Sequence, residues 1–225
     1  MVWPLFKTYK RVIGAKLRSS LSMLIGRKMA RARLRAEYYE AFRKHHPRMR
    51  YDLHWRENSL RTVDNESGMI FSGVVSILTN IGNAAGTHVL LAGESPQAKM
   101  PYSKLLSLSA DAITTTGLHE GADVHWNFEE PPPNMGSYGI IVSHEILEHL
   151  IAPYQHVCDL IRLLMPGGYL VMSTVIPGFP YHRYPVDCLR FFPDWFVEVA
   201  NRNQVEIYDQ YLGEDHIAYT FRKPV

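Results

Sequence analysis

His182 and Asp187 are the residues whose types and spacing best suit work on a reacting group. They lie five positions apart, and Arg190 follows three residues after Asp187. A histidine with a carboxylate neighbour can take a proton from a hydroxyl or an amine near neutral pH. The same three side chains could instead hold a loop in place through ion pairs, and the sequence leaves both interpretations open.

A second cluster, from His144 to His149 (HEILEH), invites comparison with the HExxH motif of zinc proteases. That motif needs two histidines four residues apart on one helix face, whereas these are five apart, about 140° around a helix. We therefore predict no metal site. The two cysteines, Cys158 and Cys188, are too few for a disulfide framework and indicate a reducing compartment.

The elements that would position these residues alternate after Gly86 between short apolar runs and helical stretches. Runs of strand length occupy residues 88–92, 112–115, 122–126, 139–143 and 169–173. Such runs suit parallel strands covered on both faces, and a helix over residues 151–164 fits between two of them. We predict an α/β fold with a Rossmann-like, doubly wound, mostly parallel sheet. Residues 204–208 and 217–221 could pair as a terminal antiparallel hairpin.

The N-terminal part is predicted to be a helical extension. Apolar residues recur every three or four positions over residues 5–25, with basic residues between them, which is the pattern of an amphipathic helix. A second helix is predicted over residues 29–44, ending before Pro47, and a third over residues 66–83.

Charge divides the chain more sharply than its formal net charge of +2 indicates. Residues 1–50 hold 14 basic and two acidic residues, a net charge of +12, so the remaining 10 basic and 20 acidic residues give −10. We predict a basic amphipathic helical arm (1–50), a helical connector (51–85) and one main domain (86–225).

The basic arm has three interpretations. It could contact a membrane surface, it could pack on the main domain or a second subunit, or it could bind nucleic acid, which is disfavoured because the sequence has no RNA-binding signature. No stretch reaches the length of a membrane span, and the N-terminus lacks the pattern of a secretory signal. We expect a cytoplasmic protein, with peripheral contact at the inner membrane face as the open alternative.

Three motifs in the main domain resemble those of one enzyme family. Residues 138–150 (YGIIVSHEILEHL) are similar to the fourth strand and following turn of class I S-adenosylmethionine-dependent methyltransferases, and residues 164–170 (LMPGGYL) to the turn before the fifth strand. Residues 182–193 (HRYPVDCLRFFP) resemble a segment of the small bacterial, type-11-like members. The resemblance covers about residues 86–222.

The resemblance implies S-adenosylmethionine as the cofactor and a set of residues that hold it. The donor would be bound by the turn after the first strand, the end of the second strand, the loop beside the adenine and the end of the fourth strand, that is by Ala92, Gly93, Glu94, Thr115, Thr116, Asn127, Phe128 and Ser143. His144 would face the methyl donor, and His182 and Asp187 would act on the acceptor, while Glu148 and His149 would brace the turn beneath the pocket.

Two departures from the family pattern keep an alternative open. Gly93 stands alone where two or three glycines are usual, and Thr114-Thr115-Thr116 stands where an acidic residue normally receives the ribose hydroxyls. We predict methyl transfer to an oxygen or nitrogen of a small molecule or a glycan or lipid-linked acceptor. The alternative is a non-catalytic binding module that has kept the fold, for example as the partner subunit of an active methyltransferase. A homodimer is the other assembly that we consider.

Overall fold

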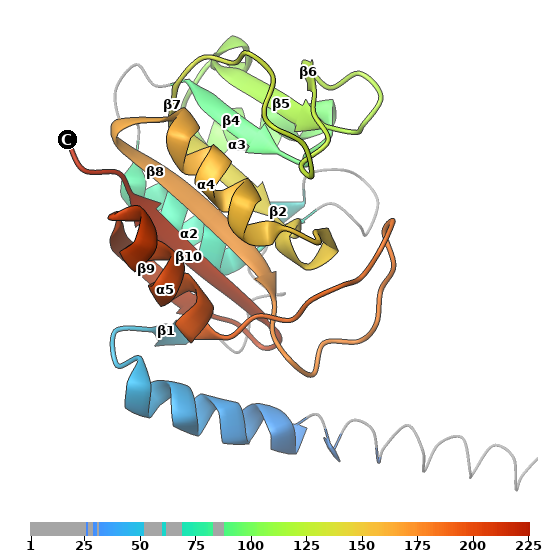
Figure 1. Ribbon diagram of the computed structural model, residues 1–225, viewed down its shortest axis with the longest axis vertical. Helices are drawn as coiled ribbons and strands as arrows, with labels where there is room; N and C mark the ends of the chain where they lie inside the picture. Colours follow the sequence, from blue (N-terminus) through green and yellow to red (C-terminus); the bar gives the residue numbers. More distant parts are fainter. Residues whose placement is uncertain (1–25, 27–28, 31, 52–59, 62–68, 83–87) are drawn as a thin grey trace, which may run out of the picture. The chain divides into compact units, whose positions relative to one another are not determined.

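The structure, a computed structural model, describes residues 26, 29–30, 32–51, 60–61, 69–82 and 88–225 (Figure 1). The helix predicted over residues 5–25 lies outside the described residues. Residues 29–30 and 32–45 are helical, as predicted for the second helix. The chain divides into two compact units, Met1–His45 and His46–Val225. Among the described residues, no helix has both the length and the apolar character needed to cross a bilayer.

An eight-stranded sheet forms the centre of the larger unit. Its order is β1-β9-β10-β8-β7-β4-β5-β6. The strands are β1 (Arg50–Tyr51), β4 (Val89–Ala92), β5 (Ile113–Gly117), β6 (Val124–His125), β7 (Tyr138–His144), β8 (Leu164–Val175), β9 (Glu206–Leu212) and β10 (His216–Arg222). Strand β10 runs antiparallel to both neighbours, and the other pairs are parallel. A separate two-stranded sheet pairs β2 (Leu60–Arg61) with β3 (Met69–Ile70).

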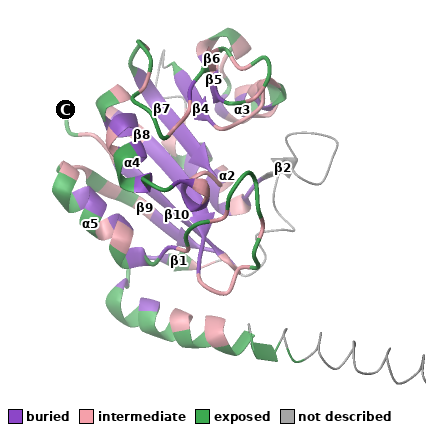
Figure 2. Cartoon of the chain, turned by 45° about the vertical axis from the view of Figure 1, so that its right-hand side comes forward, coloured by how far each residue is buried: buried purple, intermediate pink, exposed green. Residues whose placement is uncertain are grey.

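Helices cover both faces of the large sheet, which confirms the doubly wound prediction. Figure 1 shows α4 (Pro153–Leu163) and α5 (Pro193–Asn203) in front of the sheet, with α2 (Ser72–Ile81) and α3 (Lys99–Leu106) behind it. Every residue of β4 and β7 is buried (Figure 2), which explains why their sequences are apolar without alternation. The terminal hairpin is also confirmed, as β9 paired with β10.

The connector contributes more to the main unit than its sequence indicates. The predicted third helix is present as α2, which begins at Ser72 and ends at Ile81. Its buried residues Val74, Ile77 and Leu78 pack in one core with β4 and α3. The larger unit therefore includes α2 and β1, which precede the predicted domain start at residue 86.

The segment before the fifth strand of the family pattern differs from the expected turn. Strand β8 begins at Leu164, which pairs with Tyr138, and the register shifts before Ile140 pairs with Tyr169. A Cβ on Gly168 would lie 2.9 Å from the carbonyl oxygen of Met165. A glycine is needed here because any side chain would meet backbone atoms.

Candidate functional site

The carboxyl ends of three neighbouring strands bring the predicted donor residues together. Ala92 at the end of β4 pairs with Thr116 of β5 on one side and with Ser143 of β7 on the other. The Gly93 amide donates a hydrogen bond to the carbonyl of Thr116 at 2.7 Å. Ligands of open α/β sheets bind at this edge, and the structure places the predicted residues there.

Gly93 makes the turn that follows β4. Its φ of 85° lies in the left-handed region, where a residue with a side chain is strained. A Cβ at this position would lie 2.0 Å from Cδ1 of Ile146 and 3.7 Å from the ring of Phe128. The ring of His119 is hydrogen-bonded to the Gly93 carbonyl at 2.8 Å. The space above this glycine is thus occupied by the Ile146 side chain.

The two threonines at the end of β5 differ in their partners. The hydroxyl and the amide of Thr115 both donate to one oxygen of Asp123, at 2.9 and 2.7 Å, and Lys99 pairs with the same carboxylate. The Thr116 hydroxyl is fully buried and has no hydrogen-bond partner among the described residues. A buried hydroxyl without a partner is costly, and of the two threonines only Thr116 has a hydroxyl that no described residue engages.

Asn127 and Phe128 follow β6, as predicted, but only one of them faces the turn at Gly93. The Asn127 side chain is engaged within its own loop, donating to the carboxylate of Glu130 at 3.2 Å and accepting from the amide of Glu129 at 3.3 Å. The Phe128 ring lies close to Gly93 and 4.7 Å from the ring of His156.

His156 was not predicted from the sequence. It is fully buried on the inner face of α4, and its Nε2 lies 3.3 Å from the hydroxyl of Ser143. Burial lowers the pKa of His156 to about 3, so the ring is neutral. A signal existed in the sequence, because residue 156 shares a helix face with the apolar positions 157 and 160.

Glu94 adds a buried carboxyl group to this edge. Burial raises its pKa to about 7, opposed by the hydrogen bond from the Tyr102 hydroxyl, at 3.4 Å, and assisted by the nearby charge of Glu145. Because burial disfavours the charged form of this carboxyl group, a cation beside it would stabilise the carboxylate. The sulfonium and ammonium groups of S-adenosylmethionine carry that charge.

His144 lies at the end of β7 in a cluster of rings. Burial, with a second contribution from the charge of His216, lowers the pKa of His144 to about 3. The Phe71 ring lies 4.8 Å from His144 and 4.4 Å from His216. His144 is therefore neutral and does not supply a charge to a reaction.

His216, which was not expected from the sequence, carries the charge in this cluster. Its Nε2 lies 3.1 Å from Glu145 and its Nδ1 lies 2.7 Å from Asp215. Burial opposes its protonation, but the two carboxylates outweigh burial and raise the pKa to about 9. Glu145, at the carboxyl end of β7, has a φ of 53°. Nothing in the spacing of these residues could have linked β10 to the end of β7.

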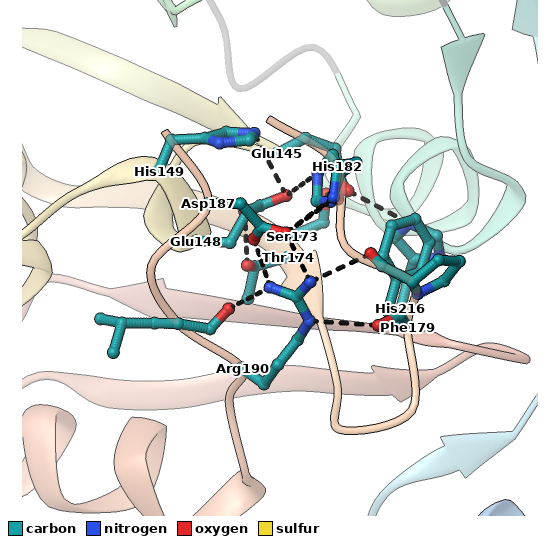
Figure 3. A network of polar contacts seen from close by, with 12 residues as sticks. Glu145, Glu148, His149, Ser173, Thr174, Phe179, His182, Asp187, Arg190 and His216 are labelled. Carbon is teal, nitrogen blue, oxygen red and sulfur yellow. Dashed lines mark hydrogen bonds and ion pairs between the residues drawn. The ribbon is translucent and has the colours of Figure 1, made fainter. Parts of the chain in front are cut away.

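The predicted acceptor residues lie together in the loop after β8 (Figure 3). The buried Asp187 carboxylate binds both terminal nitrogens of Arg190, at 2.5 and 2.8 Å, and accepts the backbone N–H of His182 at 2.7 Å. Arg190 also donates to the carbonyls of Phe179 and Pro180. Of the two interpretations, the geometry favours Asp187 as a brace for the loop.

His182 faces Glu148 as well as Asp187. Its Nε2 lies 3.7 Å from Oε1 of Glu148, and its Nδ1 lies 3.5 Å from Oδ2 of Asp187. Glu148 is the largest cause of a raised pKa for His182, followed by Asp187 among the favourable charges. The catalytic roles of His144, His182 and Asp187 stay predictions.

The residues of this edge fit both the adenosine and the charged sulfonium and ammonium groups of S-adenosylmethionine. Thr116 offers an unpartnered hydroxyl, Phe128 offers a ring beside the turn, and Glu94 offers a carboxyl group to a cation. The ligand can approach Gly93 closely only if the side chain of Ile146 moves out of the space beside this glycine.

No protein-family profile matches the chain. The curated tRNA U34 carboxymethyltransferase of Hahella chejuensis (strain KCTC 2396) is 39% identical over 51 residues, a stretch that covers 22% of this chain and 16% of that enzyme. The chain therefore matches only a small part of the length of this relative.

Solved structures resemble the chain over about two thirds of its length. The Burkholderia thailandensis 1,6-didemethyltoxoflavin-N1-methyltransferase, solved with S-adenosylhomocysteine, matches with a TM-score of 0.54 at 16% identity, covering 68% of this chain and 78% of the other. The [4+2]-cyclase SpnF matches with a TM-score of 0.53 at 14% identity, covering 68% of this chain and 81% of the cyclase. The CcbJ methyltransferase of Streptomyces caelestis matches with a TM-score of 0.53 at 12% identity, covering 66% of this chain and 93% of that enzyme. The chain has the fold of the class I S-adenosylmethionine-dependent methyltransferases.

Proposed function

We propose that this protein transfers a methyl group from S-adenosylmethionine to an oxygen or nitrogen of its acceptor. The observation that carries the proposal is the unpartnered, buried hydroxyl of Thr116 beside the Gly93 turn, at the joined carboxyl ends of β4, β5 and β7. The fold is consistent with this activity, although the fold also includes a cyclase, so the site has to carry the argument.

Four residues of the chain would hold the donor. Thr116 hydrogen-bonds a ribose hydroxyl, Phe128 packs against the adenosine, the Gly93 turn allows close approach of the backbone, and Glu94 attracts the positive charge. Ser143 is held by His156 at 3.3 Å, and its place beside Ala92 puts it at the same edge. Ile146 leaves the space at Gly93 when the donor enters.

The chemistry needs positioning more than it needs a charged catalyst. When bound, S-adenosylmethionine would supply a methyl group on a positively charged sulfur, with S-adenosylhomocysteine as the leaving group and the acceptor's proton passing to solvent. The chain holds the two partners in contact and excludes water, which by itself can supply several kcal/mol of the barrier reduction. Neutral His144 lines this region without adding charge.

The acceptor and the cellular place are finer proposals. A small molecule or a glycan or lipid-linked acceptor suits a chain whose first 50 residues carry a net charge of +12, because such an arm is attracted to anionic lipid. A cytoplasmic protein with peripheral contact at the inner membrane face would combine both features.

Calorimetric titration of the full chain with S-adenosylhomocysteine tests the proposal. We expect one site, with Thr116→Val weakening binding about tenfold because one hydrogen bond to the ligand is lost. Thr79→Val is the matched control, since Thr79 is exposed on α2 and bonds only the Val75 carbonyl. The proposal fails if the full chain binds no S-adenosylhomocysteine at millimolar concentration.

A non-catalytic binding module is the second candidate. Two observations favour this candidate. The side chain of Ile146 fills the space at Gly93, and the hydroxyl of Thr115 already donates a hydrogen bond to Asp123. Copurification with an active methyltransferase, together with no heat of binding in the titration, would support this candidate over the first.

A further inference from the structure

Glu148, His149 and His182 bring three metal-ligand atoms to one point below the loop that follows β8 (Figure 3). The three atoms lie within 4.8 Å of one another. Oε1 of Glu148 is 3.9 Å from Nε2 of His149 and 3.7 Å from Nε2 of His182. An ion with tetrahedral coordination and bonds of about 2.1 Å separates its ligand atoms by about 3.4 Å. Small movements of the three side chains would bring their ligand atoms to that spacing.

Glu148 is fully buried, and only one of its carboxylate oxygens has a hydrogen bond. Oε2 accepts the hydroxyl of Thr174 at 2.6 Å. Oε1 has no hydrogen-bond donor among the described residues, although both histidines stand near it. A buried carboxylate oxygen without a donor is strongly unfavourable. A cation at this point removes that cost.

The ring of His149 is set in the form that binds a metal. Its Nδ1 lies 2.5 Å from the carbonyl oxygen of Val186. A carbonyl can only accept, so Nδ1 carries a hydrogen, and in the neutral ring the lone pair is then on Nε2. Nε2 is the atom that faces Glu148. A backbone carbonyl behind a histidine is the usual outer support of a metal ligand.

A carboxylate also lies near His182, although Nδ1 of that ring has no hydrogen bond among the described residues. Nδ1 of His182 faces Oδ2 of Asp187 at 3.5 Å, and Nε2 faces Oε1 of Glu148. Asp187 is itself fixed by Arg190. Glu148 and His149 are each held at one atom by a hydrogen bond. The three groups come from elements as distant as η3 (Leu147–His149) and the loop after β8.

We propose that Glu148, His149 and His182 form a binding site for a divalent transition-metal ion such as Zn²⁺. Zn²⁺ and similar ions bind imidazole nitrogens together with a carboxylate oxygen, whereas Mg²⁺ and Ca²⁺ prefer ligand sets made only of oxygen. Both histidines are half-buried, so the remaining coordination positions can reach water or a small ligand. The site differs from a HExxH motif, since it joins adjacent residues 148 and 149 to a histidine 33 positions later.

Titration of the full, chelator-treated chain with CoCl₂ tests the site by a spectroscopic readout. Co²⁺ held by two imidazoles and a carboxylate gives visible ligand-field absorption, and ZnCl₂ should displace it. We expect one equivalent to bind at micromolar concentration, with the affinity lowered at least tenfold in Glu148→Gln, His149→Ala and His182→Ala. Glu148→Gln keeps the shape of the buried side chain, and circular dichroism checks that each variant is folded.

Two control variants separate this site from adventitious binding. His88 is exposed at the amino end of β4, and Cys188 is an exposed free thiol whose backbone N–H bonds the Glu148 carbonyl. His88→Ala and Cys188→Ser should bind Co²⁺ as the unmodified chain does. The proposal is overturned if these controls lose as much affinity as the three ligand variants, or if the unmodified chain saturates only at millimolar Co²⁺.

The metal site shares His182 with the predicted acceptor residues, but the two proposals are tested separately. Binding of Co²⁺ without binding of S-adenosylhomocysteine supports the metal site and contradicts the methyl transfer, and the reverse result contradicts only the metal site.

Discussion

At the scale of single residues, Ile146 is the side chain that separates an open donor site from a filled one. It occupies the space that the missing side chain of Gly93 leaves. We predict that Ile146→Ala binds S-adenosylhomocysteine about three- to tenfold more tightly, because the ligand no longer displaces an apolar side chain worth roughly 1 kcal/mol of contact. Calorimetry measures the change.

Ile151→Ala is the matched control for this substitution. Ile151 lies five residues further on, with 76% of its surface exposed, so its removal should leave the dissociation constant unchanged. Equal or weaker binding by Ile146→Ala would show that the Ile146 side chain is part of the ligand site instead of an obstacle to it.

Glu94 predicts a dependence of stability on pH. Its pKa rises from 4.5 to about 7 on folding because the group is buried, so the unfolded chain binds fewer protons than the folded one in that range. The free energy of unfolding therefore falls as pH rises from 4.5 to 7. Glu94→Gln should remove this loss and stabilise the protein at pH 8 by on the order of 2 kcal/mol, with little gain at pH 4.5.

Chemical denaturation at both pH values measures this effect. Glu120 is exposed on the loop between β5 and β6, and Glu120→Gln should leave the free energy of unfolding the same at each pH. A Glu94→Gln variant that destabilises the protein equally at both pH values would contradict the burial argument.

The residues of the site show what a sequence can and cannot predict. Gly93, Thr116 and Ser143 were found because they end apolar runs, and parallel strands bring such ends to one edge. Ile146 was missed as the occupant of the glycine's space, because packing between two turns has no sequence period. The metal ligands that we propose were not predicted, because Glu148 and His182 meet only through the fold.

At the scale of elements, strand positions were predictable and one junction was not. Every predicted strand of the large sheet exists. The central strands β4 and β7 were the most predictable, because a strand buried on both faces needs an unbroken apolar run. The start of β8 was predicted as a turn, since Pro166 and two glycines normally break a strand. The sheet accommodates them through the register shift opposite Tyr138.

The contact between α2 and the sheet gives a prediction at this scale. A Cβ on Gly73 would lie 2.3 Å from the ring of Tyr211, which is 6% exposed and belongs to β9. Gly73→Ala should therefore destabilise the protein by about 1–3 kcal/mol through overpacking, in spite of alanine's higher helix propensity. Thermal unfolding measures the loss.

Gly136→Ala is the control for this helix contact. A methyl group on Gly136 would have nothing within 4 Å of it beyond its chain neighbours, so the substitution should leave the unfolding temperature nearly unchanged. A Gly73→Ala variant that is as stable as the control would mean that α2 does not pack closely on β9.

At the scale of the whole molecule, charge and fold divide the chain at nearly the same place. The basic residues gather in positions 1–50, and the compact unit that carries the site begins at His46. Composition predicted a basic arm over residues 1–50, because charge sums over many residues, but it placed the start of the main domain at residue 86. What the arm binds could not be predicted, since membrane surfaces, partner subunits and nucleic acids all attract the same charge.

Flotation of the full chain with lipid vesicles distinguishes the membrane interpretation. We predict recovery with vesicles that contain anionic lipid and little recovery with neutral ones. Replacing Lys7, Lys10 and Arg11 together by glutamine should lower the vesicle affinity on the order of a hundredfold, since each basic residue contributes about 1 kcal/mol near an anionic surface. The matched control replaces three exposed basic residues of the larger unit, Lys104, Arg183 and Arg202. If both triple variants float equally well, the arm does not act through lipid, which leaves a partner subunit or nucleic acid as its target.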